Sequence, residues 1–364
     1  MNLGFLILVN QNKGGVYQYS LSFLDSLIQN ENIKKITVYT NLNSLEKEGV
    51  LIKKINNYKV LFFLGLVMGI LKLKPNLLFK NFDFVFSPTY SPLLFLTNTK
   101  FIFTLHDLQE KYFPEYFKKH IVLWRKFMYN GLTKNCHKII TESSHVKEDI
   151  IKYFKIDSNK ISVIESPPIF PNIDKNFSLI NNYKDLNFPY IFFPAQFWKH
   201  KNHIRVLKAF KILLDNNYKV NLVLTGSKQR EYLKIVKFIN DFKITESVRI
   251  ISNIPQNHMA HFFMNSKLVI APTLYESISI PVFEAFHYGV PVCASGVYAI
   301  IDQVGEAGEL FDPYSETAIY LALKKILDSD EKTIKNYISK GKNRLKYFSV
   351  ERFNRLINLT LNEN

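Results

Sequence analysis

The chain has 364 residues, more than one ordinary hydrophobic core holds, which favours two domains. Hydrophobic residues make up 47% and charged residues 21%, a composition that excludes a disordered chain. The formal net charge of +16 favours an anionic partner such as phosphate groups, nucleic acid or an acidic membrane face.

The start of the chain and its cysteines bear on location. MNLGFLILV lacks a basic first segment and a cleavage site, so we interpret it as a buried strand rather than a signal peptide. Cys136 and Cys293 lie in separate halves and indicate neither a disulfide framework nor a metal cluster. We therefore expect a reducing compartment, the cytoplasm.

In the first half, short apolar runs alternate with helical patterns, which is typical of an α/β sheet. A helix is predicted at residues 16–30. The predicted strands are residues 3–9, 35–40, 84–88, 100–105, 138–142 and 161–165.

The apolar run at residues 60–71 is twelve residues long, whereas a bilayer span takes about 20. We predict a buried helix for this run. An interfacial membrane element is the alternative, and neither interpretation has the chain crossing a membrane.

The second half repeats the alternation, after a stretch rich in Pro, Asn and Asp at residues 166–189 that we interpret as a linker. This repetition predicts two Rossmann-like domains with parallel sheets that face each other across a cleft. The expected domains are residues 1–175 with a closing helix at 347–364, and residues 186–346. The predicted strands are residues 190–195, 221–226, 249–253, 267–272, 290–295 and 308–312.

The stretch APTLYESISIPVFEAFHYGVPVCAS at residues 271–295 is predicted to run from a strand through a loop into a helix. Pro281 suits the first turn of that helix and Gly289 suits its end. A helix start at the carboxyl end of a strand favours a phosphate. Glu284 in the first turn could accept two ribose hydroxyls, and Glu276 could reach a sugar beyond the phosphates. The alternative is an acid that only stabilises the helix dipole.

This stretch resembles the region with two glutamates eight residues apart in family 4 glycosyltransferases, which are retaining enzymes of the GT-B fold. The resemblance implies that Glu276 contacts the donor sugar, that Glu284 holds the nucleoside ribose, and that Ser277, Ile278, Ser279 and Ile280 line the donor. Ser277 and Ser279 depart from the family, which usually has glycines there. The matching positions are Pro272, Glu276, Pro281, Glu284, Ala285, Gly289, Pro291, Val292 and Ser295.

A second stretch, FFPAQFWKHKNHIRVLKAF at residues 192–210, carries part of the same resemblance. Lys201 matches a lysine that, in the family, clamps the donor diphosphate. Gln196 stands where the family has an arginine, so one cation of the clamp is missing or comes from elsewhere, with Lys199 a candidate. Taken alone, the stretch is typical of a solvated, Lys-rich helix start.

The first domain adds three segments that resemble the family. Gly14 and Gly15 match its glycine loop near the donor, although a lone pair of glycines is more often a turn. His106, in a segment with Asp107, Pro114 and Glu115 also matching, is expected to face the cleft as a catalytic residue. A buried histidine satisfied by a carbonyl is the alternative.

The third segment is residues 138–156, where a strand is followed by a predicted helix. Ser143 and Ser144 are its candidate N-caps. Lys147 is expected to face the cleft or solvent.

Residues 111–138 hold seven Lys or Arg against one acid, interleaved with large apolar residues. This pattern predicts contact with an anionic membrane, or with the acceptor, through Lys118, Lys119, Arg125 and Lys126. An ordinary helix with a solvated basic side is the alternative.

No metal is expected at two superficially suggestive places. Asp328 and Asp330 form a D-x-D at a predicted helix end rather than after a strand. The pairs His200/His203 and His258/His261 lack further acidic or thiolate partners at metal spacing.

The resemblance implies a metal-independent, retaining glycosyltransferase with no cofactor. It would move a sugar from a UDP- or GDP-sugar to a hydroxyl of a lipid-linked or cell-surface glycan, at the inner face of the membrane. No nucleic-acid partner is expected. The alternative is a catalytically decayed protein of this fold that serves as a basic, polyanion- or membrane-binding module.

Overall fold

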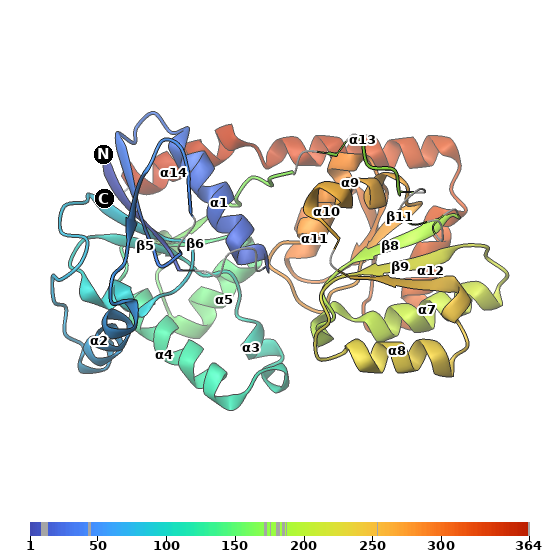
Figure 1. Ribbon diagram of the computed structural model, residues 1–364, viewed down its shortest axis with the longest axis horizontal. Coiled ribbons are helices and arrows are strands. Elements are labelled where there is room, and N and C mark those ends of the chain that lie inside the picture. The colour runs from blue at the N-terminus through green and yellow to red at the C-terminus, as the bar shows by residue number, and fades with distance from the viewer. Residues whose placement is uncertain are drawn as a thin grey trace. The chain divides into compact units, whose positions relative to one another are not determined.

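The computed structural model describes residues 1–8, 14–42, 45–170, 173–174, 176–179, 183, 186, 188–252 and 254–362. The chain divides into two compact units, Met1–Ile169 with Phe348–Asn364, and Phe170–Tyr347 (Figure 1). Each unit is built on a parallel sheet, so the predicted α/β class is confirmed.

The sheet of the first unit has the strand order β3-β2-β1-β4-β5-β6-β7, and every pairing in it is parallel. Six of these strands coincide with predicted ones. The seventh, β3, was missed because it is a short, largely exposed edge strand with two lysines and has no apolar run. The strands are β1 Asn2–Ile7, β2 Lys35–Thr40, β3 Leu51–Lys54, β4 Phe84–Ser87, β5 Phe101–Thr104, β6 Lys138–Thr141 and β7 Ile161–Val163.

Helices cover both faces of this sheet. On one face, α1 (Gly14–Ile28) and α14 (Val350–Asn362) bury large side chains against the strands. On the other lie α2 (Tyr58–Leu71), η1 (Pro92–Leu96), α4 (Lys119–Asn135) and α5 (Ser144–Phe154). The remaining short helices of the unit are α3 Gln109–Tyr112, η2 Pro114–Tyr116 and η3 Ser158–Lys160.

The closing helix α14 belongs to the first unit although it ends the chain. Phe353 meets Phe23 of α1 edge to face, with ring centroids 4.8 Å apart. Arg352 pairs with Glu165 just after β7 at 2.6 Å. These contacts fix the C-terminal segment to the core that the N-terminal strands form.

The prediction of a buried helix at residues 60–71 is wrong. The helix forms as α2, but Gly65 is its only fully buried residue. Val60, Phe63 and Ile70 are 66%, 68% and 64% exposed. The exposure follows from the way α2 is held. Gly65 approaches the carbonyl of Pro92 closely because it has no side chain, and this contact joins α2 to η1. The larger side chains of α2 stay outside the contact.

The apolar side chains of α4 behave in the opposite way. Met128 and Leu132 are buried in the core, and Trp124 and Phe127 pack against it. Leu123 is the one large apolar residue of α4 that is mostly exposed. The row of apolar residues predicted to face a membrane from this helix therefore faces the protein instead.

The sheet of the second unit has the order β10-β9-β8-β11-β12-β13, again all parallel. All six strands coincide with predicted ones. They are β8 Tyr190–Pro194, β9 Asn221–Thr225, β10 Val248–Ile251, β11 Leu268–Ala271, β12 Val292–Ser295 and β13 Gly308–Phe311.

Helices cover both faces of the second sheet as well (Figure 1). One face carries α7 (His203–Asp215), α8 (Tyr232–Asp241) and α12 (Glu316–Leu327). The other carries α9 (Gln256–Met264), α10 (Ile280–Tyr288), α11 (Ala299–Val304) and part of α13 (Glu331–Tyr347). The short helices η5 Lys199–Lys201 and η6 Thr245–Ser247 complete this unit.

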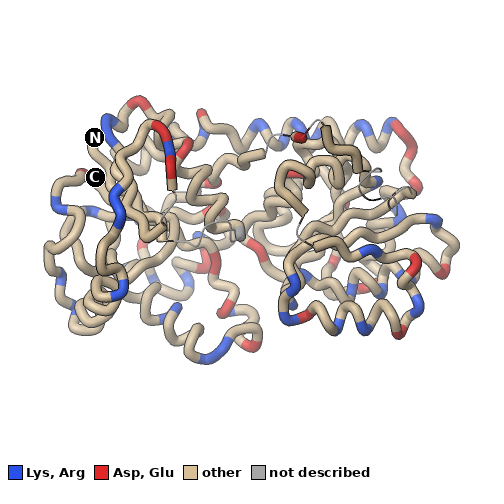
Figure 2. The backbone as a smooth tube through the Cα atoms, viewed as in Figure 1, with Lys and Arg blue, Asp and Glu red and all other residues tan. Residues whose placement is uncertain are grey.

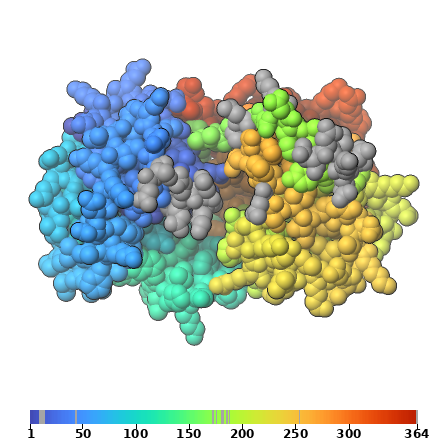
Figure 3. All heavy atoms as spheres, viewed as in Figure 1, coloured from blue at the N-terminus to red at the C-terminus, as the bar shows by residue number. Residues whose placement is uncertain are grey.

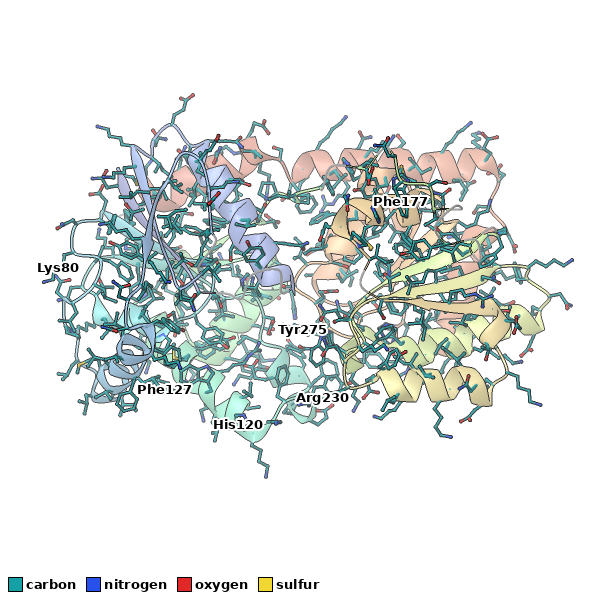
Figure 4. The ribbon with its side chains drawn as sticks, in the orientation of Figure 1. Lys80, His120, Phe127, Phe177, Arg230 and Tyr275 are labelled. Atoms are coloured by element: carbon teal, nitrogen blue, oxygen red, sulfur yellow. The ribbon has the colours of Figure 1, made fainter. Side chains whose placement is uncertain are left out.

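Asp174 and Phe177 of the predicted linker pack on α9 of the second unit. The carbonyl of Asp174 lies 2.8 Å from Nε2 of His261. The ring of Phe177, labelled in Figure 4, stacks on His258 at 3.9 Å. The His258/His261 pair thus anchors the segment that enters this unit.

Replacing Gly65 with alanine tests how α2 is held. A Cβ there would lie 2.3 Å from the carbonyl oxygen of Pro92, a backbone atom that cannot rotate away. We expect Gly65→Ala to lower the free energy of unfolding by about 1–3 kcal/mol, despite the higher helix propensity of alanine. Gly69→Ala is the control, because its Cβ would meet only the Phe95 and Phe127 rings. Urea denaturation measures both, and equal stability of the Gly65 variant and wild type would contradict this packing.

Candidate functional site

The two side chains of the second unit that were predicted to be catalytic lie together. Lys201, at the end of η5, and Glu276, after β11, form an ion pair with 2.5 Å between Nζ and Oε1. Both side chains remain about one fifth exposed. The pair therefore stands at the carboxyl edge of the sheet, where it can still be reached from solvent.

Asn202 joins the loops that carry this pair. Its backbone is left-handed, with φ 64°, and its side chain is buried. The side-chain amide donates to the carbonyl of Pro272 at 3.1 Å and to that of Pro313 at 2.8 Å. The Leu274 amide adds a bond to the carbonyl of His200 at 2.7 Å. The loops after β8, β11 and β13 are thus held together.

Gln196 is engaged within its own loop. Its side-chain oxygen accepts a hydrogen bond from the indole of Trp198 at 2.8 Å. This bond orients the glutamine amide, and it explains how an uncharged residue is held at the position where the resemblance implies a cation. Lys199 is the first residue of η5, three positions after Gln196.

The start of α10 differs from a free anion site in one respect. The backbone N–H of Ser279, the N-cap, donates to Oε1 of Gln303 at 2.7 Å, and the Gln303 amide donates back to the Ser279 carbonyl at 2.8 Å. Sequence reasoning missed Gln303, which comes from α11 and has no motif around it. The predicted donor-lining role of Ser279 is therefore corrected, because its own amide is already satisfied and its side chain is buried. Ser277, Ile278 and Ile280 are half-buried.

The predicted helix signals around Pro281 and Gly289 are confirmed. Pro281 lies in the first turn of α10, and Gly289 ends the helix with φ 70°. The placement of Glu284 in the first turn is wrong by one residue, because α10 begins at Ile280 and its first turn holds no acid. The dipole role considered for Glu284 loses its basis with that shift.

Glu284 is instead a buried carboxyl, only 8% exposed. Burial raises its pKa to about 8, so it holds a proton at neutral pH in this state. A buried acid of this kind costs stability when it ionises, unless a ligand supplies hydrogen bonds. A buried, protonated carboxyl in the helix that follows the Glu276 loop fits a ligand-binding role.

A pair of tyrosines that sequence reasoning missed flanks the same loop. Tyr275, labelled in Figure 4, precedes Glu276 and lies 4.9 Å from the ring of Tyr298. Tyr298 has φ 50° and ψ −136°, a region that non-glycine residues rarely occupy. Such backbone strain concentrates at functional loops. The signal in the sequence is weak, because nothing around Tyr298 predicts a positive φ.

In the first unit, His106 follows β5 and both of its ring nitrogens have acceptors. Nδ1 lies 2.8 Å from Oε2 of Glu142, and Nε2 lies 2.7 Å from the carbonyl of Pro88. Burial lowers the pKa of His106, but the hydrogen bond and charge of Glu142 outweigh it and leave the pKa above its usual value. The arrangement matches the alternative of a buried histidine satisfied by a carbonyl. A catalytic role for its ring nitrogens would need one of these bonds to be exchanged.

Arg125 was predicted to face the acceptor or a membrane, but the structure turns its side chain toward two acids of the same unit. Its guanidinium reaches Asp107 at 2.8 Å and the buried Glu110 at 2.7 Å. Although burial opposes ionisation, these two acids hold the pKa of Arg125 above its ordinary value. The cation therefore organises the segment after His106. Lys118, Lys119 and Lys126 are exposed.

Other predicted positions of the first unit are placed as follows. Gly14 and Gly15 are the first residues of α1, while residues 9–13 of the glycine segment lie outside the described part. Ser143, not Ser144, caps α5 by accepting a hydrogen bond from Val146 N at 3.3 Å. Lys147 is half-buried on the first turns of that helix.

The D-x-D lies at a helix end, as predicted. Asp328 is the C-cap of α12 and pairs with Lys324 and Tyr218. Within the described ranges, no three His, Cys, Asp or Glu side chains gather in a way that could hold a metal. Among the helices described here, none is both long and apolar enough to cross a bilayer.

Two family models match the chain. The model for glycosyl transferases group 1 matches residues 175–344, and the model for glycosyltransferase family 4 matches residues 34–167. The chain belongs to the group 1 glycosyltransferases of family 4. The two matches correspond to the two units described above.

Two relatives agree with this assignment. The chain is 24% identical to the O-antigen chain mannosyltransferase RfbU of Salmonella typhimurium over 86% of this chain and 87% of that protein. It is 22% identical to the O-antigen chain mannosyltransferase B of Escherichia coli over 62% and 61%.

The fold matches solved structures over nearly the whole chain. Anabaena Alr3699/HepE, solved in complex with UDP and glucose, gives a TM-score of 0.76 at 16% identity and covers 100% of both chains. WaaG, a glycosyltransferase involved in lipopolysaccharide biosynthesis, gives 0.69 at 12% identity, with 99% and 98% covered. The glycosyltransferase thus has the GT-B architecture of two Rossmann-like units.

The pKa of Glu284 makes a prediction about stability. An acid whose pKa rises from about 4.5 to about 8 on folding makes the wild type lose stability as pH rises through that window. Glu284→Gln removes this loss, so its free energy of unfolding should equal that of the wild type near pH 4 and exceed it by up to about 4 kcal/mol at pH 8. Urea denaturation across this range measures the difference. A difference independent of pH would contradict a neutral buried carboxyl.

Proposed function

We propose that this glycosyltransferase moves a hexose from a UDP- or GDP-sugar to a hydroxyl of a growing lipid-linked glycan, with retention and without a metal. The observation that carries the proposal is the Lys201–Glu276 pair at the carboxyl edge of the second sheet. The mannosyltransferase names of the relatives make mannose the first sugar to test.

Lys201 would stabilise the departing diphosphate. The bond between sugar and phosphate breaks with negative charge developing on the phosphate oxygens, and a fixed ammonium lowers the energy of that state. Asn202 supports this role, because its two hydrogen bonds hold the loop before α7 against the loop that carries Glu276. Positioning is thus built in before the donor arrives.

Glu276 would leave Lys201 and bind hydroxyls of the donor sugar once the diphosphate takes its place. Glu284 would accept the ribose hydroxyls, a contact that favours its ionised form. No residue of the sequence is an evident covalent nucleophile with a partner acid at glycosidase spacing. Retention would then come from attack of the acceptor on the same face, within an ion pair.

The proposed acceptor and cellular location rest on the net charge of the chain and on its relatives. The net charge of +16 and the exposed Lys118, Lys119 and Lys126 support association with an anionic membrane face. The O-antigen chain transferases among the relatives support a growing glycan as the acceptor, and we place that glycan on a lipid at the cytoplasmic face. A peripheral cytoplasmic enzyme is therefore proposed.

The experiment that tests the proposal is a melting screen followed by an assay. UDP, GDP and their hexoses are added singly, and the matching nucleotide is expected to raise the melting temperature. Transfer from the matching sugar should continue in EDTA, with the product's anomeric signal showing retention. If no nucleotide stabilises the protein, the alternative of a decayed binding module replaces this proposal. Activity lost in EDTA and restored by magnesium or manganese would refute the metal-free part.

Lys201→Ala should lower the turnover rate at saturating donor by ~10²-fold or more, because one donor to the developing charge is lost. Lys208→Ala is the matched control, since it removes an exposed lysine of α7 that pairs with Glu316 on the surface. Steady-state assays with both variants measure the effect. A rate unchanged by the Lys201 substitution would rule out the clamp.

Glu276→Gln and Glu284→Gln should separate kcat from KM. The first change touches the reacting sugar and is expected to depress kcat, while the second touches the remote ribose and should mainly raise the donor KM. Because Glu284 holds a proton up to about pH 8 without ligand, nucleotide affinity should also rise with pH toward that value. Glu284→Gln should abolish this rise. Identical kinetic effects of the two substitutions would contradict the division of roles.

A further inference from the structure

The helix α2 carries an apolar stripe that no part of the described chain covers. Val60, Phe63, Val67 and Ile70 are spaced by three and four residues, which places them on one helix face. Three of them are about two thirds exposed. Leu71, Leu73 and Leu77 continue the exposed apolar surface beyond the helix. A contiguous surface of this kind marks an interaction site rather than scattered surface residues.

The charged residues of α2, of the segments that flank it in the sequence and of α4 all have one sign. Residues 49–82 contain six lysines and no Asp or Glu. α4 lies beside α2, where Trp124 stacks on Phe62 at 5.9 Å, and its residues 119–135 likewise contain no acid. Figure 2 colours the Lys and Arg residues of the first unit blue, and Figure 3 shows the blue-coloured early segments at the surface of that unit. A cationic rim around an apolar face complements an anionic, amphiphilic partner.

A pocket of about 850 Å³ opens between the end of α2 and α4. Phe95 and Phe127 are among its apolar lining, and no acid lines it. Its lining includes four exposed lysines that have no ion-pair partner in the part of the chain the structure describes, namely Lys72, Lys74, Lys100 and Lys134.

This pocket is separate from the candidate active site of the same unit. Lys100 and Phe101 stand at the amino end of β5, and Cys136 and His137 stand just before β6. His106 and Ser143 follow the carboxyl ends of those same strands. Because the strands are parallel, the pocket and His106 lie at opposite edges of the sheet.

We propose that this pocket binds the phosphate headgroup of an anionic lipid while the α2 stripe enters the acyl boundary of the bilayer. The inference rests on the membrane association proposed above and assigns it to a surface. α2 supplies the apolar contact, and α4 supplies cations rather than the apolar face predicted for it. Lys72 and Lys74 follow the stripe directly, so one lipid can meet a cation at its headgroup and an apolar side chain below it.

Vesicle binding tests the stripe. Wild-type protein is expected to bind vesicles of phosphatidylglycerol and phosphatidylcholine at low salt, and not vesicles of phosphatidylcholine alone. The double variant Phe63→Ser/Ile70→Ser should bind about tenfold more weakly or worse, because two apolar anchors are lost. The matched control is Leu233→Ser/Leu321→Ser, which removes two exposed leucines of the second unit and should bind like wild type.

A charge-matched comparison tests the pocket. Lys72→Gln/Lys74→Gln/Lys134→Gln should weaken binding and flatten its salt dependence. Lys332→Gln/Lys342→Gln/Lys346→Gln lowers the net charge equally on α13 of the second unit and should bind like wild type. An environment-sensitive dye on Ile70→Cys should shift to the blue on anionic vesicles, whereas the same dye on Leu233→Cys should not. Both native cysteines are buried, which favours labelling at the introduced one.

The outcomes are separable from those of catalysis, because nucleotide binding by each variant is measured in the same preparations. Equal vesicle binding by the stripe variant and wild type would overturn the proposal. Capture of soluble pyrophosphate by the pocket with no vesicle binding would make it a site for free phosphate instead. A dimer in sedimentation that Phe63→Ser/Ile70→Ser dissociates would show that a second copy covers the stripe. If the nucleotide screen fails while lipid binding follows these expectations, only the glycosyl-transfer proposal is lost.

Discussion

The candidate site of the second unit depends on the two hydrogen bonds that the side-chain amide of Asn202 donates. The amide satisfies the carbonyls of Pro272 and Pro313, which lie in the loops after β11 and β13. Each buried hydrogen bond of this kind contributes about 1 kcal/mol net, but leaving a buried carbonyl unpaired costs more. Asn202 also has a left-handed backbone, which turns the chain from η5 into α7 and sets Lys201 opposite Glu276. The position of Lys201 opposite Glu276 therefore depends on the turn that Asn202 makes between η5 and α7.

The first unit uses a different device for the same purpose. Arg125 ties Asp107 and Glu110 together, and the carboxylate of Glu142 holds His106. The Arg125–Glu110 pair is the most buried of these. Such a pair contributes little net stability, yet removing one partner leaves an uncompensated charge at a cost of about 3–5 kcal/mol. The segment after β5 is thus rigid through charge pairing, where the second unit is rigid through neutral amides.

Most of the fold could be predicted from the sequence because buried parallel strands are short apolar runs, and these runs are visible without a structure. β3 escaped because an exposed edge strand with lysines carries no such run. Lys201 and Glu276 were each predicted as site residues by resemblance to the family, and the structure brings them together as an ion pair that was not predicted. Gln303 and Tyr298 could not have been predicted, since the contact of Gln303 with Ser279 and the backbone of Tyr298 are set by tertiary packing.

The exposure of α2 was missed for a related reason. Its apolar residues surround the whole helix, and only the close contact at Gly65 decides which side faces the core.

Positions 279 and 196, where the sequence departs from the family motif, both bear on how a diphosphate would be held. The backbone amide of residue 279 donates to Gln303, so in this state it is not available to a phosphate whichever side chain stands there. An arginine at position 196 would add a cation, but here Gln196 is held by Trp198. The diphosphate would then depend on Lys201 more than in a site with two cations. In this state Glu276 neutralises Lys201, so the lysine is held in place without an uncompensated charge. Arrival of a diphosphate would exchange one anion for another at the same ammonium and free the carboxylate for the sugar.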